Sequence, residues 1–486
     1  MGALVIQLTK KETAAKKFAL LFSLVPFILA VSVYLGFERG VVQPQFVEKV
    51  TWVKAYGISY FLGVDGFNLL LLVLVSLLVL IVTLASAIPN RPKAFFATIL
   101  ILETGLLGVF LALDMILFYI FWETVLIPTY LLIHIWGGPN RARAALKFII
   151  YTLVGSVIML VGMLAIYFKA GIHSFDLIKL ASINYPLGFQ RLAFGALFLG
   201  LAVKVPLFPF HNWQPDAYTE APTTVTMLLS GCLAKMGAYG FFRLILPITP
   251  RGAHEFGLYV TILALITVIF GDLCASAQRD LKRMFAYSSL SHMGLIILGI
   301  SCAMTMSLRM GKVAKSGVSI ALQGSAIHMF NHGIIAASLF FLIGLIYQRM
   351  KTRDLMELQG LLTGIPTIIG LFWFTALASF GFPALSGFPG EIMIIMGTFE
   401  SKGAWAAIIA LVGVLIMAGY VFWVLLRIGF GKVAERHASV TDLNLAELVA
   451  ILPLSALILL FGFYPAPLTS VVKIPVNTLV SLISKL

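Results

Sequence analysis

Charged residues and cysteines are scarce in this sequence. Only 11% of its 486 residues are charged and 60% are hydrophobic, whereas soluble domains carry about 25% charged residues. This composition excludes a soluble enzyme and a disordered chain. The three cysteines, Cys232, Cys274 and Cys302, are isolated, so the sequence encodes no disulfide scaffold, iron–sulfur cluster or structural zinc site. A Walker A motif and a G-x-G-x-x-G motif are also lacking. We therefore expect no cofactor and no metal, and energy from a gradient or a partner.

Long apolar runs fill the chain instead. Each is close to the roughly 20 residues that cross a bilayer as a helix, and none has the short alternating pattern of a membrane barrel. The sequence therefore predicts an all-α, polytopic membrane protein. We expect 13 spans, at residues 18–36, 64–88, 94–112, 115–135, 148–168, 191–209, 222–243, 256–275, 285–303, 318–346, 366–399, 404–427 and 446–464.

The N-terminus begins with a short apolar segment, GALVIQL, followed by Thr9, Lys10 and Lys11. Seven apolar residues cannot cross a bilayer. A signal peptide would place its basic residues before the apolar segment, which is not the order here. We interpret the segment as the last turns of a helix whose beginning is missing.

The net charge of +14 reflects basic loops between the spans. Of the 34 Lys and Arg residues, 30 fall in loops, 17 on one side and 13 on the other. Because basic residues near span ends favour the cytoplasm, we place the richer side inside the cell, where it meets anionic lipid rather than nucleic acid. The loops on that side are 10–17, 89–93, 136–147, 276–284, 347–365 and 429–445.

Two spans are interrupted by proline and glycine. Residues 191–213 contain Pro206 and Pro209, and residues 366–399 contain the segment GFPALSGFPG. Such interrupted spans at matching places in two halves are typical of transporters built from inverted repeats. We predict two inverted five-helix repeats, each with a discontinuous helix in fourth place. The expected domains are 1–91 (N-terminal helices), 92–246 (first repeat), 252–430 (second repeat) and 431–486 (C-terminal helix and tail).

Three ionisable residues lie deep in predicted spans, where charge is costly and usually functional. Glu123 lies near the middle of FYIFWETVLIPTYLLI, Lys204 precedes Pro206 in the first interrupted helix, and Lys235 lies between Gly231 and Gly237. We expect Glu123 to pair with a lysine, and the Lys204 ammonium to meet carbonyls that Pro206 leaves without donors. The alternatives are a neutral, helix-linking acid for Glu123 and a side chain that reaches the interface for Lys204.

Further candidates lie in the second half. Glu391 follows GFPG and could simply cap a helix. His328 and His332 are four residues apart on one helix face, but the H-E-x-x-H glutamate is missing, so proton relay and a water-binding polar core remain equally open, as for His292. Other candidates are Glu103, for a relay or a helix bridge, and Asp114, which ranks lower because it lies near a span boundary. Loop charges are expected to form caps, turns and subunit contacts; they are Asp65, Asp216, Glu220 and residues 279–283.

Three segments carry a family resemblance: FYIFWETVLIPTYLLIHIWGG, VKVPLFPFHNWQPDAYTEAPTTVTMLLSGCLAKMGAYGFFR and AYSSLSHMG. They resemble the antiporter-like subunits of proton-pumping NADH–quinone oxidoreductase, respiratory complex I, and KMGAYG and GFPGE resemble those of type M. The resemblance implies 14 transmembrane helices, neighbouring membrane subunits as partners and a bacterial or archaeal cell membrane. It also implies that Glu123 pairs with Lys204, that Lys235 is the central relay, and that histidines link it to a terminal Glu391. The short N-terminal helix departs from this pattern.

The resulting hypothesis is that quinone reduction elsewhere in the complex separates Glu123 from Lys204. The Lys204 proton then passes through waters to Lys235, past His332, to Glu391. Three alternatives stay open: a subunit of a multi-subunit Na⁺/H⁺ antiporter, a subunit of a membrane-bound hydrogenase, and a structural spacer that moves no protons.

Overall fold

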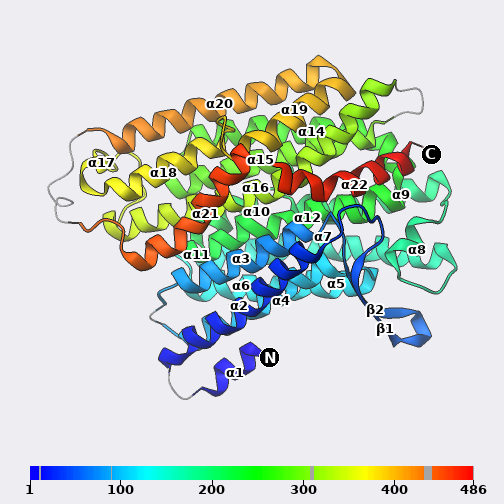
Figure 1. The fold of residues 1–486 in the computed structure, drawn as a ribbon, viewed down its shortest axis with the longest axis horizontal. Coiled ribbons are helices and arrows are strands. Elements are labelled where there is room, and N and C mark those ends of the chain that lie inside the picture. Colours follow the sequence, from blue (N-terminus) through cyan, green and yellow to red (C-terminus); the bar gives the residue numbers. More distant parts are fainter. Residues whose placement is uncertain (10–11, 89, 307–310, 432–439, 485–486) are drawn as a thin grey trace.

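A computed structural model describes residues 1–9, 12–88, 90–306, 311–431 and 440–484. Helices lie roughly alongside one another in a single bundle, with α20 along one edge and α1 and α2 along the other (Figure 1). The all-α prediction is confirmed for the spans: 12 described helices are long and apolar enough to cross a membrane, and two shorter apolar helices, α3 and α18, accompany them.

The N-terminal segment contains helices α1 (Gly2–Leu8), α2 (Glu12–Gly36) and α3 (Leu69–Ala85). The short helix α1 packs on α2 and α4, and Gly2 allows this because a Cβ there would lie 2.6 Å from the Phe22 ring. Between α2 and α3 the chain forms an antiparallel hairpin that the sequence analysis did not predict, made of strands β1 (Gln45–Val53) and β2 (Ile58–Val64). Most of β1 is exposed, so its apolar pattern is too weak to signal a strand.

The first predicted repeat begins with α4 (Pro92–Leu111), α5 (Met115–Thr124), α6 (Leu126–Trp136), α7 (Arg141–Ala170), α8 (Leu177–Ala181), α9 (Leu187–Lys204) and α10 (Trp213–Glu220). The helix break expected at Pro206 and Pro209 is present, between α9 and α10. A buried helical stretch follows, consisting of α11 (Thr223–Leu228), α12 (Ala234–Gly240) and α13 (Leu246–Ile248), joined by the π-helical turns η2 (Leu229–Leu233) and η3 (Phe241–Ile245).

The second predicted repeat contains α14 (Pro250–Ser276), α15 (Leu281–Met304), α16 (Lys312–Met350), α17 (Leu361–Gly364), α18 (Pro366–Ser379), α19 (Gly387–Lys402) and α20 (Ala404–Gly429). The second expected break lies between α18 and α19. Gly381 in this break has φ +70°, a conformation that favours glycine, and a Cβ there would lie 2.2 Å from Glu391 Oε2.

The C-terminal region consists of α21 (Leu445–Phe463) and α22 (Ala466–Ile483). The tail expected from the sequence after residue 464 is wrong, because these residues form a helix that packs on α13 and α16. Two prolines, Pro467 and Pro475, interrupt the apolar pattern there and hide the helix from a search for uninterrupted runs.

The centre of the bundle is formed by α11–α13, α15 and α16, whose apolar stretches are almost completely buried, whereas α2 is mainly exposed. A helix that is apolar on all sides must be covered on all sides by protein or lipid. The break residues and most of the buried charges lie on or beside these central helices, so the fold places them away from lipid.

Candidate functional site

Lys204 is the last residue of α9 and its side chain is buried, with 1% of it exposed. Its ammonium does not meet the carbonyls near Pro206 as predicted, because Nζ has no hydrogen-bond partner. Instead it lies 5.2 Å from the centre of the Trp122 ring. One carbonyl of this turn, that of Val203, accepts a hydrogen bond from Trp213 Nε1 at 2.9 Å. A buried ammonium that faces aromatic rings and has no hydrogen-bond partner is weakly stabilised.

Glu123 follows Trp122 near the end of α5, two residues before the helix is interrupted at Val125. Its Oε1 atom is buried without a hydrogen-bond partner. In the part of the chain that the structure describes, no carboxylate lies within 4.0 Å of Lys204 Nζ, although Glu123 is near enough to interact with it electrostatically. The expected Glu123–Lys204 ion pair is therefore open in this structure.

Lys235 lies on α12, directly after the π-helical turn η2, and is completely buried. Its Nζ donates a hydrogen bond to the Ser230 carbonyl at 2.5 Å and lies 2.6 Å from His332 Nδ1. π-helical turns are frequent at functional sites. As expected from the sequence, Gly237 permits close helix approach: a Cβ there would lie 2.9 Å from the Leu201 carbonyl, so α12 packs directly against α9.

Beyond Lys235 a line of histidines leads to Glu391. The His332 and His292 rings are 4.8 Å apart between their centroids, and His292 Nδ1 lies 3.4 Å from His328 Nε2. Glu391 Oε1 lies 3.6 Å from His292 Nδ1 and 4.0 Å from His328 Nε2. Four helices, α12, α16, α15 and α19, thus contribute side chains to one buried line, which we call the relay line and which consists of Lys235, His332, His292, His328 and Glu391.

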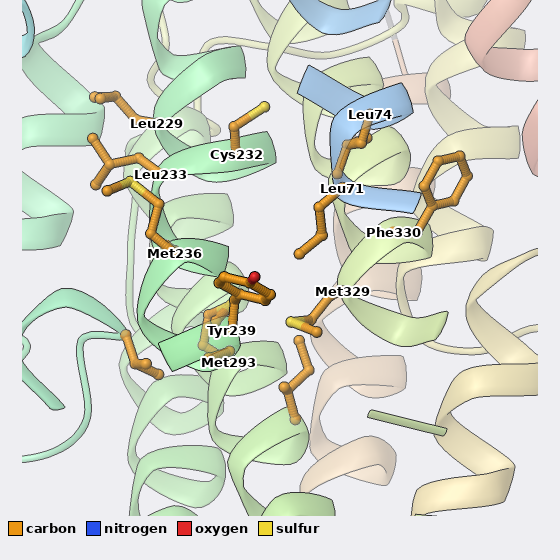
Figure 2. Close-up of a cluster of buried hydrophobic side chains, with 14 of the residues drawn as sticks. Leu71, Leu74, Leu229, Cys232, Leu233, Met236, Tyr239, Met293, Met329 and Phe330 are labelled. Atoms are coloured by element: carbon orange, nitrogen blue, oxygen red, sulfur yellow. The ribbon is translucent and has the colours of Figure 1, made fainter. Parts of the chain in front are cut away.

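Apolar side chains surround this line. Leu233, at the end of η2, and Met236, on α12, are close to Lys235 in sequence, and Met293 and Met329 are each adjacent in sequence to a histidine of this line. Figure 2 shows these four side chains in a cluster of buried apolar residues. All four are buried, with at most 1% of each exposed. Because such surroundings have a low effective dielectric constant, a charge on one relay group acts strongly on its neighbours.

Between Lys204 and Lys235 no described hydrogen bond makes a direct link. Polar groups from α10 and α15 nevertheless contact η2, the turn that contains Ser230: Tyr218 donates to the Leu229 carbonyl at 2.9 Å, and Ser230 Oγ lies 2.9 Å from Ser289 Oγ. Gln214 Oε1 is buried without a partner. A proton crossing this interval therefore needs water, which polar, unsatisfied groups of this kind bind.

Glu103 and Asp114 lie outside the relay line. Glu103 on α4 is 3% exposed, its Oε1 atom has no hydrogen-bond partner, and it interacts electrostatically with Cys232, three residues before Lys235. Asp114 is the N-cap of α5 and accepts hydrogen bonds from the backbone N–H groups of Ile116 and Leu117. Asp114 was ranked below the other candidate site residues, and its capping of α5 agrees with that ranking.

Two buried ionisable residues, Asp272 and Lys282, were not predicted from the sequence to be buried. Asp272 on α14 is fully buried and accepts hydrogen bonds from Ser291 Oγ at 2.7 Å and from the Tyr420 hydroxyl at 3.2 Å. It also interacts electrostatically with Glu391. The single aspartate in the apolar run IFGDLC could have identified Asp272 as a candidate, because an acid at that depth in a membrane span is rare.

Lys282 was expected in a loop, with the rest of residues 279–283, and this is wrong. Its side chain is 3% exposed and donates hydrogen bonds to the carbonyls of Ala221, at 2.5 Å, and Thr219, at 3.2 Å, where α10 ends. The run of charges around it hides this burial in the sequence. Its neighbour Asp280 does cap α15, as expected, by accepting from the Arg283 N–H.

Other loop charges form ion pairs. Asp216 pairs with Lys147 at 2.7 Å and with Arg283 at 3.0 Å, and Asp65 pairs with Arg243 at 2.7 Å. The first two pairs tie α7 and α15 to α10, the helix that follows the first break. These charges therefore hold the broken helix in place and are not part of the relay line.

Comparison of the sequence with protein families finds one match. A profile of the family described as "NADH:quinone oxidoreductase/Mrp antiporter, TM" matches residues 112–417. Among curated relatives, NADH-quinone oxidoreductase subunit M of Rhodobacter capsulatus is 38% identical over 474 residues, 94% of this chain and 89% of that protein. Subunit M of Rickettsia typhi is 36% identical, over 95% of this chain and 91% of that protein.

Comparison of the folds gives similar results. A chain of respiratory complex I from Thermus thermophilus superposes with a TM-score of 0.85 at 26% identity, covering 99% of this chain and all of that one. A chain of the Mrp complex from Dietzia sp. superposes with a TM-score of 0.84 at 21% identity, covering 99% of this chain and 96% of that one. At that identity the second likeness concerns the fold alone.

Proposed function

The chain belongs to the family of transmembrane subunits shared by NADH:quinone oxidoreductases and Mrp antiporters, and we propose that it moves protons through Lys204 and the relay line. The single observation that carries this proposal is the unbroken row of buried titratable groups from Lys235 to Glu391. Buried ionisable groups in membrane proteins mark proton relays, because their cost is otherwise hard to offset.

The protein is a membrane subunit of NADH–quinone oxidoreductase, integral to a bacterial cell membrane and bordered by other membrane subunits. We further propose that it acts as a translocase that carries no redox centre. Its role is then to convert a change at its boundary with a neighbouring subunit, driven by quinone reduction elsewhere, into proton movement.

Glu123 and Lys204 form the proposed gate. Charges about 4 Å apart attract by about 4 kcal/mol at an effective dielectric constant near 20, whereas an aromatic face offers a cation roughly 0.5–2 kcal/mol. Closing the pair therefore favours a protonated Lys204, and opening it favours release of the proton. The open geometry seen here, with Lys204 Nζ over Trp122, corresponds to the releasing arrangement.

The proton released from Lys204 then passes through water to Lys235 and along the relay line. Lys235 is in direct contact with His332 Nδ1, so a proton leaving the ammonium has an acceptor at hydrogen-bond distance. The histidines pass it to Glu391, whose Oε1 atom has no donor from the described residues. Re-forming the Glu123–Lys204 pair reloads Lys204.

Removal of either gate charge tests this function. We expect Glu123→Gln and Lys204→Ala complexes, reconstituted in proteoliposomes, to oxidise NADH but to translocate fewer protons per electron, because the gate has lost one of its two states. Subunit content measured on native gels shows whether assembly persists. Lys49→Ala is the matched control, since Lys49 is a half-exposed lysine paired with Asp176 outside the site. Normal proton-to-electron ratios in both gate variants would contradict the proposal.

Sodium transport is the main alternative, because the family whose profile matches residues 112–417 also includes Mrp antiporters. Proton uptake by the reconstituted complex in sodium-free buffer distinguishes the two, and we expect it to be unchanged. A hydrogenase subunit would instead co-purify with a nickel enzyme, and a structural spacer would leave the gate variants fully active.

A further inference from the structure

Three ligand atoms at the end of the relay line form a compact triangle. His292 Nδ1 and His328 Nε2 are 3.4 Å apart, and Glu391 Oε1 lies 3.6 Å from the first and 4.0 Å from the second. Zinc–ligand bonds of about 2.0–2.1 Å at tetrahedral angles place neighbouring ligand atoms about 3.3 Å apart. The triangle therefore matches one face of a zinc coordination tetrahedron once its longest side, from Glu391 to His328, shortens by about 0.7 Å.

The chemistry of the triangle also fits zinc. Two imidazoles and one carboxylate, with a fourth position left for water, are a common zinc ligand set. Magnesium and calcium prefer ligand sets made of oxygen atoms. The three residues are held by separate helices, α15, α16 and α19, and are buried, so the ligands approach one another without a loop having to fold around the ion. Glu391 Oε1 has no competing hydrogen bond.

We propose that His292, His328 and Glu391 bind a Zn²⁺ ion that stops proton transfer at the end of the relay line. Binding follows from the triangle itself, and only the block of transport rests on the proposed function. The ion takes the place between the imidazoles and the carboxylate that a relayed proton must occupy, and its two positive charges repel an ammonium on Lys235.

This ligand set differs from the one that sequence spacing suggests. His328 and His332, four residues apart, point along one helix face, but His332 Nδ1 is engaged by Lys235 at 2.6 Å. His292, from a different helix, completes the triangle instead. A zinc site here thus depends on the packing of α15 against α16, which no local motif records.

Metal content provides the first test. The complex is incubated with Zn²⁺, passed through a desalting column and analysed for bound zinc by mass spectrometry and zinc-edge X-ray absorption. We expect His328→Gln and Glu391→Gln to retain one zinc fewer per complex than the parent, and the difference spectrum to show two imidazoles and one carboxylate. His134→Gln is the matched control, because His134 is a partly buried histidine of α6 outside the triangle. Equal zinc content in all four complexes would overturn the proposal.

Inhibition provides the second test. Proton translocation by each complex is measured against Zn²⁺ concentration and scaled to that variant's own metal-free rate. Because losing even a supporting residue of a metal site commonly costs about 10- to 100-fold in affinity, we expect the inhibitory concentration to rise at least about tenfold in His328→Gln and to stay unchanged in His134→Gln. Mg²⁺ at the same ionic strength should not inhibit. An unchanged inhibitory concentration in His328→Gln would refute the block at this position.

The two tests separate this inference from the proposed function. If Glu391→Gln loses one bound zinc but pumps normally, the metal site stands and the relay role of Glu391 fails. If Glu391→Gln stops pumping while all variants bind zinc equally, the relay role stands and the metal site fails.

Discussion

At the scale of single residues, the proposed role of Lys235 requires that its ammonium can lose a proton. The ammonium touches only the Ser230 carbonyl and His332 Nδ1 among the described residues, and neither is a carboxylate that would fix its charge. A lysine can be neutral in such a site, whereas an arginine stays charged in proteins. The identity of the cation therefore matters as much as its presence.

Exchange of lysine for arginine tests this point. We expect Lys235→Arg to lose most proton translocation although the positive charge is retained, because the guanidinium cannot release its proton to His332. The measurement is the proton-to-electron ratio in proteoliposomes, with NADH oxidation as the reference. Lys49→Arg should behave like the parent, and a normal ratio in Lys235→Arg would show that proton release from this residue is not needed.

Asp272 provides a second test at this scale. It is a buried acid with two hydroxyl donors, from Ser291 and Tyr420, and no cationic partner among the described residues. Because it interacts electrostatically with Glu391, Asp272→Asn should shift the pH at which proton translocation is half-maximal while leaving assembly intact. The pH profile of the proton-to-electron ratio measures this shift, and an unchanged profile would restrict Asp272 to a packing role.

At the scale of helices, the contact between α16 and α19 sets the position of His328. Gly390 lies so close that a Cβ there would be 2.8 Å from both His328 Cβ and Nδ1. Distances of this kind force a shift of one partner. The absence of a side chain at residue 390 is thus a condition for the geometry of the relay line.

We expect Gly390→Ala to lower proton translocation several-fold, because it displaces His328 from Glu391. Gly370→Ala is the matched control: Gly370 lies in the neighbouring helix α18, and a Cβ there meets no atom within 4 Å. The proton-to-electron ratio and the zinc content of both variants measure the effect. Equal values for the two variants would mean that the α16–α19 contact tolerates a methyl group.

The start of α18 depends on a carboxylate. Asp442 accepts hydrogen bonds from the Thr367 N–H at 2.8 Å and the Ile368 N–H at 3.2 Å. Partial burial alone would raise the pKa of Asp442, but the hydrogen bonds from Thr367 and Ile368 outweigh this effect and lower the pKa below its ordinary value of 3.8. An anion at a helix N-terminus contributes about 0.3–1 kcal/mol.

Because the folded-state pKa is lowered, the stabilisation by Asp442 is fully present above pH 3.8 and is lost as the pH falls through the folded-state value. We expect Asp442→Asn to be less resistant to SDS-induced unfolding than the parent at pH 7, and the difference to vanish in strong acid. A difference of the same size at every pH would exclude the carboxylate charge as its source.

At the scale of the whole molecule, orientation in the membrane remains a prediction from the uneven charge of the loops. It places residues 347–365 inside the cell and the loop between α8 and α9 outside. In intact cells a membrane-impermeant maleimide should therefore label Asn184→Cys and reach Lys351→Cys only after permeabilisation. Both positions are exposed. The reverse labelling pattern would invert the orientation.

Sequence alone predicted most of the spans, both helix breaks and all five residues of the relay line as candidates, because each leaves a local signal: length, proline or an isolated ionisable residue. It missed the β1–β2 hairpin, whose first strand is mostly exposed, and helix α22, where prolines interrupt the apolar pattern. It also missed that Lys282 and Asp272 are buried. Those depend on which helices pack together, and the open Glu123–Lys204 pair depends on distances that spacing along the chain does not determine.

The close spacing of the histidines limits how many protons they can hold at once. His332 and His292 are 4.8 Å apart between ring centroids, so two imidazolium charges there would repel by about 3 kcal/mol at an effective dielectric constant near 20. A second proton is thus kept out until the first has left. Under the proposed function, the row therefore holds one proton at a time, which limits transport to one proton for each opening and closing of the gate.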